Sequence, residues 1–492
     1  MNPLNSTPTS QNSAKPAAKR PLGLPPRVAI YVIGALLILS ADSETLSILP
    51  LLRELALEYG LDAAQIAWVV SLPGLTAAGL VPVMSRLGDM FGVRRMLMVS
   101  LAMAGVGNLI CTLADGPTGL MAGRALIGGG VACIPLFYAY LRLQSDTEEA
   151  VNSAAGFMTA MIGGGLVVAF LLGGAIMELG GSVRTVLWII TGLSVIVFVL
   201  LWVALPENFT RVKSSIDYVG AVLLVAALTG LVLGLSEGNE WGWTSLGTVS
   251  SLGGGVILLV IWAAWERRID SPIIDLEVIL RREVWPAFVV CALTTFMGVS
   301  AVLTASQYLQ TPEKVGYGFG MTPLTVGLYF LPVGVMMAFG GMIMRPIIGR
   351  FGVRAVSALG GLVSMLTFGW FSMTDEASWK FLVMLFFFGA AYALTVTAGA
   401  SAYLRAARPG ETGMVSGAAR IVATALGAIG PAIVTALLTA SFIPKTKVPQ
   451  GDNYDNVWMF FALCGAIVVA VSLLIRQSAV RNDLAPNVVQ AA

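Results

Sequence analysis

The chain has 492 residues, of which 57% are hydrophobic and 11% are charged. Soluble domains carry about a quarter of charged residues, so the composition indicates a polytopic membrane protein without a separate soluble domain. The formal net charge of +2 points to no nucleic-acid partner. Histidine is absent, so a proton carried at neutral pH has to ride on a carboxylate.

Apolar runs of about 20 residues, long enough to cross a bilayer, recur along the chain. An even number of spans places both termini on one side of the membrane. Most Lys and Arg residues fall in inner loops when that side is the cytoplasm. We predict fourteen membrane-spanning helices with cytoplasmic termini, at residues 28–50, 64–84, 93–113, 118–141, 150–176, 184–204, 216–236, 246–266, 284–308, 321–344, 353–373, 380–404, 413–440 and 456–476.

Ionisable residues inside these spans are rare, and each costs roughly 2.5–3.5 kcal/mol on insertion scales. The first span contains Asp42 and Glu44, and the fourth contains Arg124. At 1.5 Å per residue, Asp42 and Arg124 both lie about 21 Å from the inner surface. Arg420, in the thirteenth span, is closer to the inner end, where its side chain can snorkel.

These charges have two readings. In the functional hypothesis, Asp42 or Glu44 takes up and releases a proton while Arg124 biases its titration. In the alternative, a static buried ion pair fixes helix packing. The two acids lie about 200° apart around the helix, so we expect one to meet Arg124 and the other to face the central cavity. The sequence does not decide which acid does which.

A charged loop is predicted between the second and third spans. Its residues 85–95 read Ser-Arg-Leu-Gly-Asp-Met-Phe-Gly-Val-Arg-Arg. The loop resembles the signature of the major facilitator superfamily, Gly-x-Leu-x-Asp-x-x-Gly-x-Arg-Arg, with a serine in place of the first glycine. The resemblance implies an inner gate in which Asp89 pairs with Arg94. A solvated turn that satisfies the positive-inside rule is the alternative. The matching residues are Leu87, Asp89, Gly92, Arg94 and Arg95.

A short repeat supports two related halves. The tetrapeptide Phe-Gly-Val-Arg occurs at 91–94 and again at 351–354, in both places at the head of a spanning run. We therefore predict an all-α membrane protein of the major facilitator fold, with two six-helix bundles and two inserted helices. The segment between the inserted helices and the second bundle, called the linker below, is either an interfacial amphipathic helix or a solvated connection. The predicted parts are a disordered cytoplasmic tail (1–27), the first bundle (28–204), the inserted helices (216–266), the linker (267–283), the second bundle (284–476) and a second cytoplasmic tail (477–492).

The fifth span carries a glycine pattern that resembles the superfamily's antiporter signature, with Ala169 and Phe170 in place of its Gly-Pro pair. Gly165, Gly173 and Gly174 keep the small residues that allow helices to approach closely. A plain packing face explains the glycines equally well. Asp42 followed by Leu-Pro at 49–50 resembles the fourteen-helix drug:proton antiporter branch, which implies a bacterial inner membrane.

We predict a proton-coupled exporter of hydrophobic or amphipathic small molecules, such as drugs or toxic metabolites, working by alternating access. No enzyme motif, metal site or cofactor site is recognisable. The partners are a small-molecule substrate, protons and the lipid bilayer, and the sequence allows a monomer. An uptake carrier or uniporter, a lipid translocase and a non-transporting scaffold or sensor remain alternatives. The residues predicted to line the substrate cavity are Gln307, Tyr308 and Tyr392.

Overall fold

The computed structural model describes residues 26–143, 148–205, 217–269, 272–373, 377–407, 412–443 and 448–476. The predicted tails lie outside these residues, apart from the start of α1. In the described part no strand forms, and one isolated bridge pairs Phe442 with Pro449. The helices are α1 (Pro26–Leu46), η1 (Leu49–Leu51), α2 (Leu52–Tyr59), α3 (Ala63–Phe91), α4 (Val93–Leu113), α5 (Pro117–Gly130), α6 (Cys133–Leu143), α7 (Glu148–Glu178), α8 (Val183–Ala204), α9 (Tyr218–Trp241), α10 (Leu246–Glu266), α11 (Leu276–Ile279), α12 (Trp285–Gln310), η2 (Glu313–Val315), α13 (Pro323–Phe371), α14 (Ser378–Ala406), α15 (Thr412–Leu438) and α16 (Gly451–Ser472).

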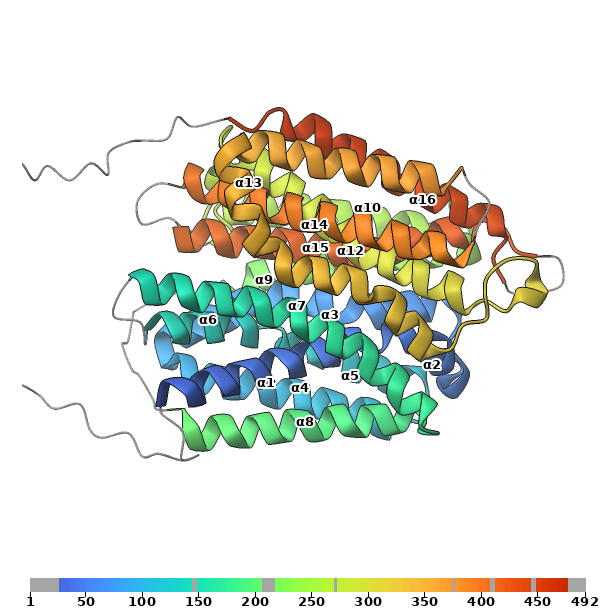
Figure 1. Cartoon of the computed structure of the whole chain (residues 1–492), viewed down its shortest axis with the longest axis horizontal. Coiled ribbons are helices and arrows are strands. Elements are labelled where there is room, and N and C mark those ends of the chain that lie inside the picture. Colours follow the sequence, from blue (N-terminus) through green and yellow to red (C-terminus); the bar gives the residue numbers. More distant parts are fainter. Residues whose placement is uncertain are drawn as a thin grey trace, which may run out of the picture.

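Thirteen candidate membrane spans lie within the described residues, together with a shorter apolar helix at Pro323–Met337. This shorter helix coincides with the tenth of the fourteen predicted spans, so the predicted count is close. The helices run side by side along the long axis of the molecule, as Figure 1 shows. Helices α1 and α3 to α8 form one group, and α12 to α16 form the other. We call the end that holds Gly92 and the linker the inner end, and the opposite end the outer end.

The predicted charged loop is almost entirely helical, which corrects the sequence-based boundaries. Helix α3 runs to Phe91 and α4 begins at Val93, so Gly92 is the only residue between them. Gly92 has a φ of 104°, which residues with a side chain rarely adopt. Gly352, in the second copy of the tetrapeptide, has a φ of 79° and interrupts α13. The repeated sequence therefore has the same backbone function in both halves.

Two predicted helices are broken. The first span ends as an α-helix at Leu46 and continues through η1 into α2. The fourth span is interrupted after Gly130, and α6 resumes at Cys133. Three successive glycines, residues 128–130, precede this break, and glycine is a weak helix former. The break lies midway along the span, where an interrupted helix exposes backbone groups to a site between the bundles.

The two bundles are packed closely at the outer end. A Cβ built on Gly174 of α7 would lie 2.4 Å from Leu324 Cα of α13, so these backbones touch. Ser306 Oγ of α12 donates a hydrogen bond to the Leu49 carbonyl of η1. A Cβ on Gly74 of α3 would lie 3.0 Å from Ala428 Cβ of α15. These contacts close the interface between the bundles on its outer half.

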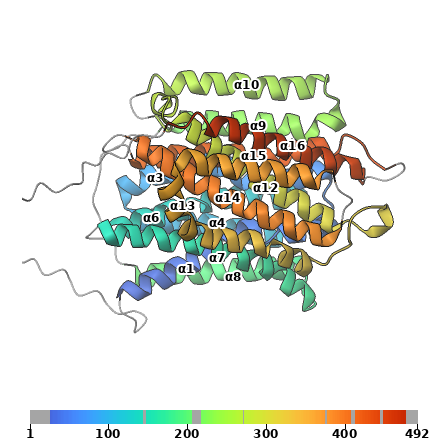
Figure 2. The same cartoon turned by 45° about the horizontal axis from the view of Figure 1, so that its top comes forward.

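Helices α9 and α10 form a hairpin beside the bundles, with α10 outermost (Figure 2). Helix α9 packs on both α3 and α15, whereas α10 packs mainly on α9. Asn239, near the outer end of α9, donates to the Ala436 carbonyl of α15 and to Thr439 Oγ1 just after that helix. Only 17% of the apolar stretch of α10 is buried within the protein, so its remaining surface is suited to lipid.

Candidate functional site

Arg124 is buried in the first bundle, where it binds two backbone carbonyls. Its Nε donates to Val69 O at 2.9 Å, and its NH1 donates to Glu44 O at 2.6 Å. Val69 O has no helical partner because the residue four positions on is Pro73, which lacks an N–H. Glu44 O lies in the last turn of α1, where carbonyls have no partner within the helix. Arg124 therefore ties α5 to α1 and α3 by completing hydrogen bonds that those helices leave open.

The Glu44 carboxylate contacts two serines. Its Oε1 accepts hydrogen bonds from Ser194 Oγ of α8 at 2.7 Å and from Ser40 Oγ of α1 at 3.0 Å. The side chain is 3% exposed. No ion pair links the Glu44 carboxylate to Arg124 within the described residues, although the guanidinium acts on it electrostatically. Arg124 therefore contacts Glu44 at its backbone carbonyl and not, as expected, at its carboxylate.

Asp42 lies opposite a glycine of α7. A Cβ on Gly165 would stand 2.4 Å from Asp42 Oδ2, so only glycine leaves room for this carboxylate. Asp42 is 8% exposed, and its Oδ2 accepts no hydrogen bond. Such a buried carboxylate oxygen is costly unless it gains a proton or a partner. The structure thus distinguishes the two acids: Glu44 is hydrogen-bonded, and Asp42 retains an unused oxygen.

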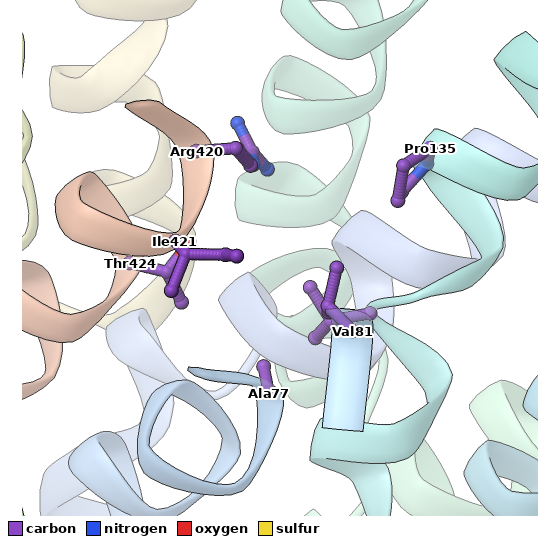
Figure 3. Close-up of a pocket in the computed structure, with 7 residues that line it drawn as sticks. Ala77, Val81, Pro135, Arg420, Ile421 and Thr424 are labelled. Carbon is purple, nitrogen blue, oxygen red and sulfur yellow. The ribbon is translucent and has the colours of Figure 1, made fainter. Parts of the chain in front are cut away.

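A small cavity, with room for about one water molecule, lies between the bundles, inward of the outer contacts. Figure 3 shows Arg420 and Ile421 of α15 facing Pro135 of α6 across this space, with Ala77 and Val81 of α3 along one side. Among the described residues that line it, Arg420 carries the only charge, Thr424 is polar, and the others are apolar. In the part of the chain that the structure describes, the exposed Arg420 side chain makes no hydrogen bond or ion pair.

The break in the fourth span borders the cavity and is also close to the two buried acids. Val131 and Pro135, on either side of that break, line the cavity. Cys133 between them is buried and lies within the electrostatic reach of both Glu44 and Asp42. Arg420 is the charged group with the largest electrostatic effect on Asp42, even though it belongs to the other bundle. Asp42 and Arg420 therefore lie in different bundles within electrostatic range of each other, without an ion pair in the part of the chain that the structure describes.

The predicted gate residues remain within their own bundle where their contacts are described. Arg94 donates to the Trp202 carbonyl near the end of α8. Asp89 is exposed on the last turns of α3, and Arg95 is exposed at the start of α4. Gly92 forms the turn between the two helices. The structure thus brings these four residues together at the inner end.

The glycines of the fifth span line two interfaces. A Cβ on Gly173 would lie 2.7 Å from the Ser47 carbonyl, next to η1, and Gly174 touches α13. Gly165 accommodates Asp42, as described above. The three glycines thus allow close contact with the first helix on one side and with the second bundle on the other.

None of the three residues predicted to line a substrate cavity is among those that line the cavity beside Arg420. Tyr308 is 1% exposed and packs in a cluster of aromatic rings that includes Tyr317, Phe381 and Tyr454. Tyr392 packs against α12, where a Cβ on Gly298 would lie 2.7 Å from its ring. Gln307 precedes Tyr308 near the outer end of α12 and is partly buried. Tyr308 in particular serves packing because rings surround it.

A sequence profile of the Major Facilitator Superfamily matches residues 32–431 of the chain. The chain belongs to the Major Facilitator Superfamily. It is therefore a multi-pass membrane transporter rather than an enzyme, and it moves small molecules across a membrane. The predicted resemblance and fold class are confirmed.

Similar proteins include several that are named for resistance or for transport. The methyl viologen resistance protein SmvA of Salmonella typhimurium is 29% identical over 415 residues, covering 82% of this chain and 81% of that protein. The probable actinorhodin transporter of Streptomyces coelicolor is 31% identical over 326 residues, covering 63% and 55%. The lincomycin resistance protein of Streptomyces lincolnensis is 26% identical over 464 residues, covering 93% and 92%.

Solved structures of other transporters share the fold. A peptide transporter of the POT family has a TM-score of 0.67 at 15% identity, covering 92% of this chain and 94% of its own. The nucleoside transporter NupG has a TM-score of 0.64 at 11% identity, covering 92% of this chain and all of its own. At this identity the likeness concerns the fold alone.

The sequence indicated most of these residues, but it did not place Arg420 at a cavity between the bundles. Its depth, close to the inner end of its span, suggested a side chain that reaches the surface. One feature of the sequence could have marked Arg420 as a candidate. Few charges occur inside the spans, and each needs a partner or a watery cavity. Arg420 lies at such a cavity.

Proposed function

We propose that this transporter exports hydrophobic or amphipathic small molecules, such as drugs or toxic metabolites, in exchange for protons. The observation that carries the proposal is the buried Asp42 carboxylate, which has an unpartnered oxygen opposite Gly165 of α7. The family supports it as well, because relatives that match most of the chain are named for resistance to methyl viologen and lincomycin. The cavity between the bundles is lined mostly by apolar side chains, as a site for such substrates would be.

In this proposal Asp42 carries the proton, and Glu44 and Arg124 support the helices around it. Glu44 already accepts two hydrogen bonds, which favour a fixed side chain. Arg124 already serves two carbonyls. Asp42 alone combines burial, a free oxygen and a cation on the opposite bundle. A group whose environment changes when the bundles move is what proton coupling requires.

Alternating access would proceed by opening the outer contacts and closing the inner end. The outer half of the interface is packed, so this conformation corresponds to a state with its cavity on the inner side. The bilayer would be a bacterial inner membrane with both termini in the cytoplasm, and the working unit would be a monomer. Gln307 and Tyr392 remain proposed substrate contacts in a conformation in which the outer contacts have opened.

A reconstituted transport assay tests the proposed function. The purified protein is placed in liposomes with an amphipathic fluorescent dye, and a pH gradient is imposed without ATP. We expect dye movement against its own gradient, driven by inward proton movement and abolished by a protonophore. Flux that follows only the dye gradient would instead identify a uniporter, and lipid scrambling without dye transport would identify a translocase.

Replacing Arg420 by Gln is expected to shift the pH dependence of transport upward by about 1 pH unit. Removing the cation that faces Asp42 lets the carboxylate keep its proton to higher pH, so proton release to the inner side requires a more alkaline medium. The initial rate of dye transport at a series of pH values measures the shift. The KM for the dye should change less than kcat.

Two further variants control this prediction. Arg420→Lys keeps a positive charge and should restore most of the normal pH profile. Arg405→Gln removes an exposed arginine at the inner end of α14, outside the cavity lining, and should leave the profile unchanged. A profile that is the same in the wild type and in Arg420→Gln would remove Arg420 from the coupling mechanism.

A further inference from the structure

Two acids are buried at the inner end of the inserted helices, away from the cavity. Asp217 immediately precedes α9, Glu266 ends α10, and they are 4% and 3% exposed. Each uses one oxygen to hold the fold. Asp217 Oδ1 accepts from Gly220 N at 2.8 Å and from Trp265 Nε1 at 2.9 Å. Glu266 Oε2 accepts from Ile274 N in the linker at 3.3 Å.

The second oxygen of each acid has no partner, and the two point at the same place. Asp217 Oδ2 and Glu266 Oε1 accept no hydrogen bond. A Cβ built on Gly220 would lie 2.0 Å from the Asp217 oxygen and 2.9 Å from the Glu266 oxygen. Two ionised carboxylates facing each other without water repel one another and lose their hydration. The arrangement needs a positive species between the two oxygens.

No side chain of the described residues supplies that charge. Among the described residues, Asp217 is the one charged group with an electrostatic effect on Glu266. Arg267 and Arg268 follow α10 with exposed side chains. In the linker, Asp275 Oδ1 caps α11 through the N–H groups of residues 277 and 278. The Trp262 indole lies beside Glu266 without hydrogen-bond geometry.

We propose that Asp217 and Glu266 bind one proton between them, shared by Asp217 Oδ2 and Glu266 Oε1, and that this proton holds the linker against α10. A single proton gives each oxygen the partner it lacks and removes the repulsion, because two close carboxylates titrate as a pair. This site is separate from Asp42 and does not depend on the proposed export function.

The shared proton has a structural consequence because the linker is anchored on both sides. Ile274 and Val278 are each 2% exposed and pack with Val415 and Ala418 of α15. The Glu266 carboxylate joins the same segment to the inserted hairpin through Ile274 N. Loss of the proton places two negative charges at this junction, so residues 272–279 should detach from α10 as the pH rises.

Hydrogen exchange of the full-length protein in lipid nanodiscs tests the inference. Exchange of residues 272–279, corrected for its intrinsic pH dependence, should be slow at low pH and accelerate about tenfold or more above a single transition. The infrared carbonyl band of a protonated carboxylic acid should disappear over the same pH range. Exchange that stays equally slow over the whole range in which the protein is folded would overturn the proposal.

Amide variants imitate the protonated pair and separate it from other causes. In Glu266→Gln, the amide nitrogen can donate to Asp217 Oδ2 while its oxygen still accepts from Ile274 N. In Asp217→Asn, the amide donates to Glu266 Oε1. Both should keep the linker protected at every pH, and either one suffices if the other does not fold. Glu277→Gln changes an exposed linker acid and should keep the wild-type response.

Two further results would count against a shared proton. Faster exchange of the linker in both amide variants at low pH would show that the ionised form is the stable one. Protection at high pH that requires added Mg²⁺ or Ca²⁺ would show that a metal ion neutralises the pair. Either result would show that Asp217 and Glu266 do not share a proton.

Discussion

Asp42→Asn is expected to abolish proton-driven transport while leaving the fold intact. Asn has nearly the shape of Asp, so it fits the space opposite Gly165, but it cannot bind and release a proton. We expect uphill dye transport in liposomes to fall on the order of 100-fold. Exchange of labelled for unlabelled dye at equal pH should continue, because that process moves no net protons.

Glu44→Gln is the matched control for this prediction. A Gln oxygen can still accept hydrogen bonds from Ser40 and Ser194, and the backbone carbonyl that binds Arg124 is unchanged. This variant should retain most of its proton-driven transport. The opposite pattern, with coupling kept in Asp42→Asn and lost in Glu44→Gln, would assign the proton to Glu44.

Gly174→Ala is expected to loosen the outer closure between the bundles. The new methyl would lie 2.4 Å from Leu324 Cα, 2.5 Å from Leu324 N and 2.8 Å from Pro323 C, all backbone atoms that cannot rotate away. Helices α7 and α13 must therefore separate at this end, and overpacking of this kind costs about 1–3 kcal/mol. Uphill transport should fall about tenfold, since a shift of 1.4 kcal/mol changes an equilibrium tenfold.

The measurement is the labelling of a cysteine introduced at Ser47, which is buried next to Gly173 at the outer end. The four native cysteines are buried and are replaced first. A membrane-impermeant thiol reagent should react about tenfold faster in Gly174→Ala. Gly164→Ala adds the same methyl to α7 where nothing lies within 4 Å, so it should behave as the wild type. Equal labelling in the two variants would show that this contact does not keep the outer end closed.

Where the sequence-based boundaries were wrong, local backbone chemistry explains the difference. The charges at 86–91 suggested a loop, but these residues continue α3 because its end at the membrane surface tolerates them. The fourth span was predicted as one helix, since its apolar run is continuous. Hydropathy distinguishes segments that lie in lipid from segments that lie in water, and it does not detect the helix break after three glycines.

The candidate site was predictable in its members but not in its contacts. Asp42, Glu44 and Arg124 stand out because charges inside spans are rare. The sequence offered no means to see that Arg124 completes the carbonyl left open by Pro73, because that carbonyl belongs to a distant helix. The Asp217–Glu266 pair was missed for the same reason: its members are 49 positions apart at the ends of two different helices.

By itself, the sequence determined the membrane class, the order of the spans and the family. The reason is that a lipid solvent requires long apolar helices, whose signal is local and strong. Only the tertiary structure decided which acid keeps a free oxygen, that Arg420 faces the cavity and that the outer end is closed. Those properties depend on the rotation of each helix and on the neighbour it meets, and a linear pattern carries neither.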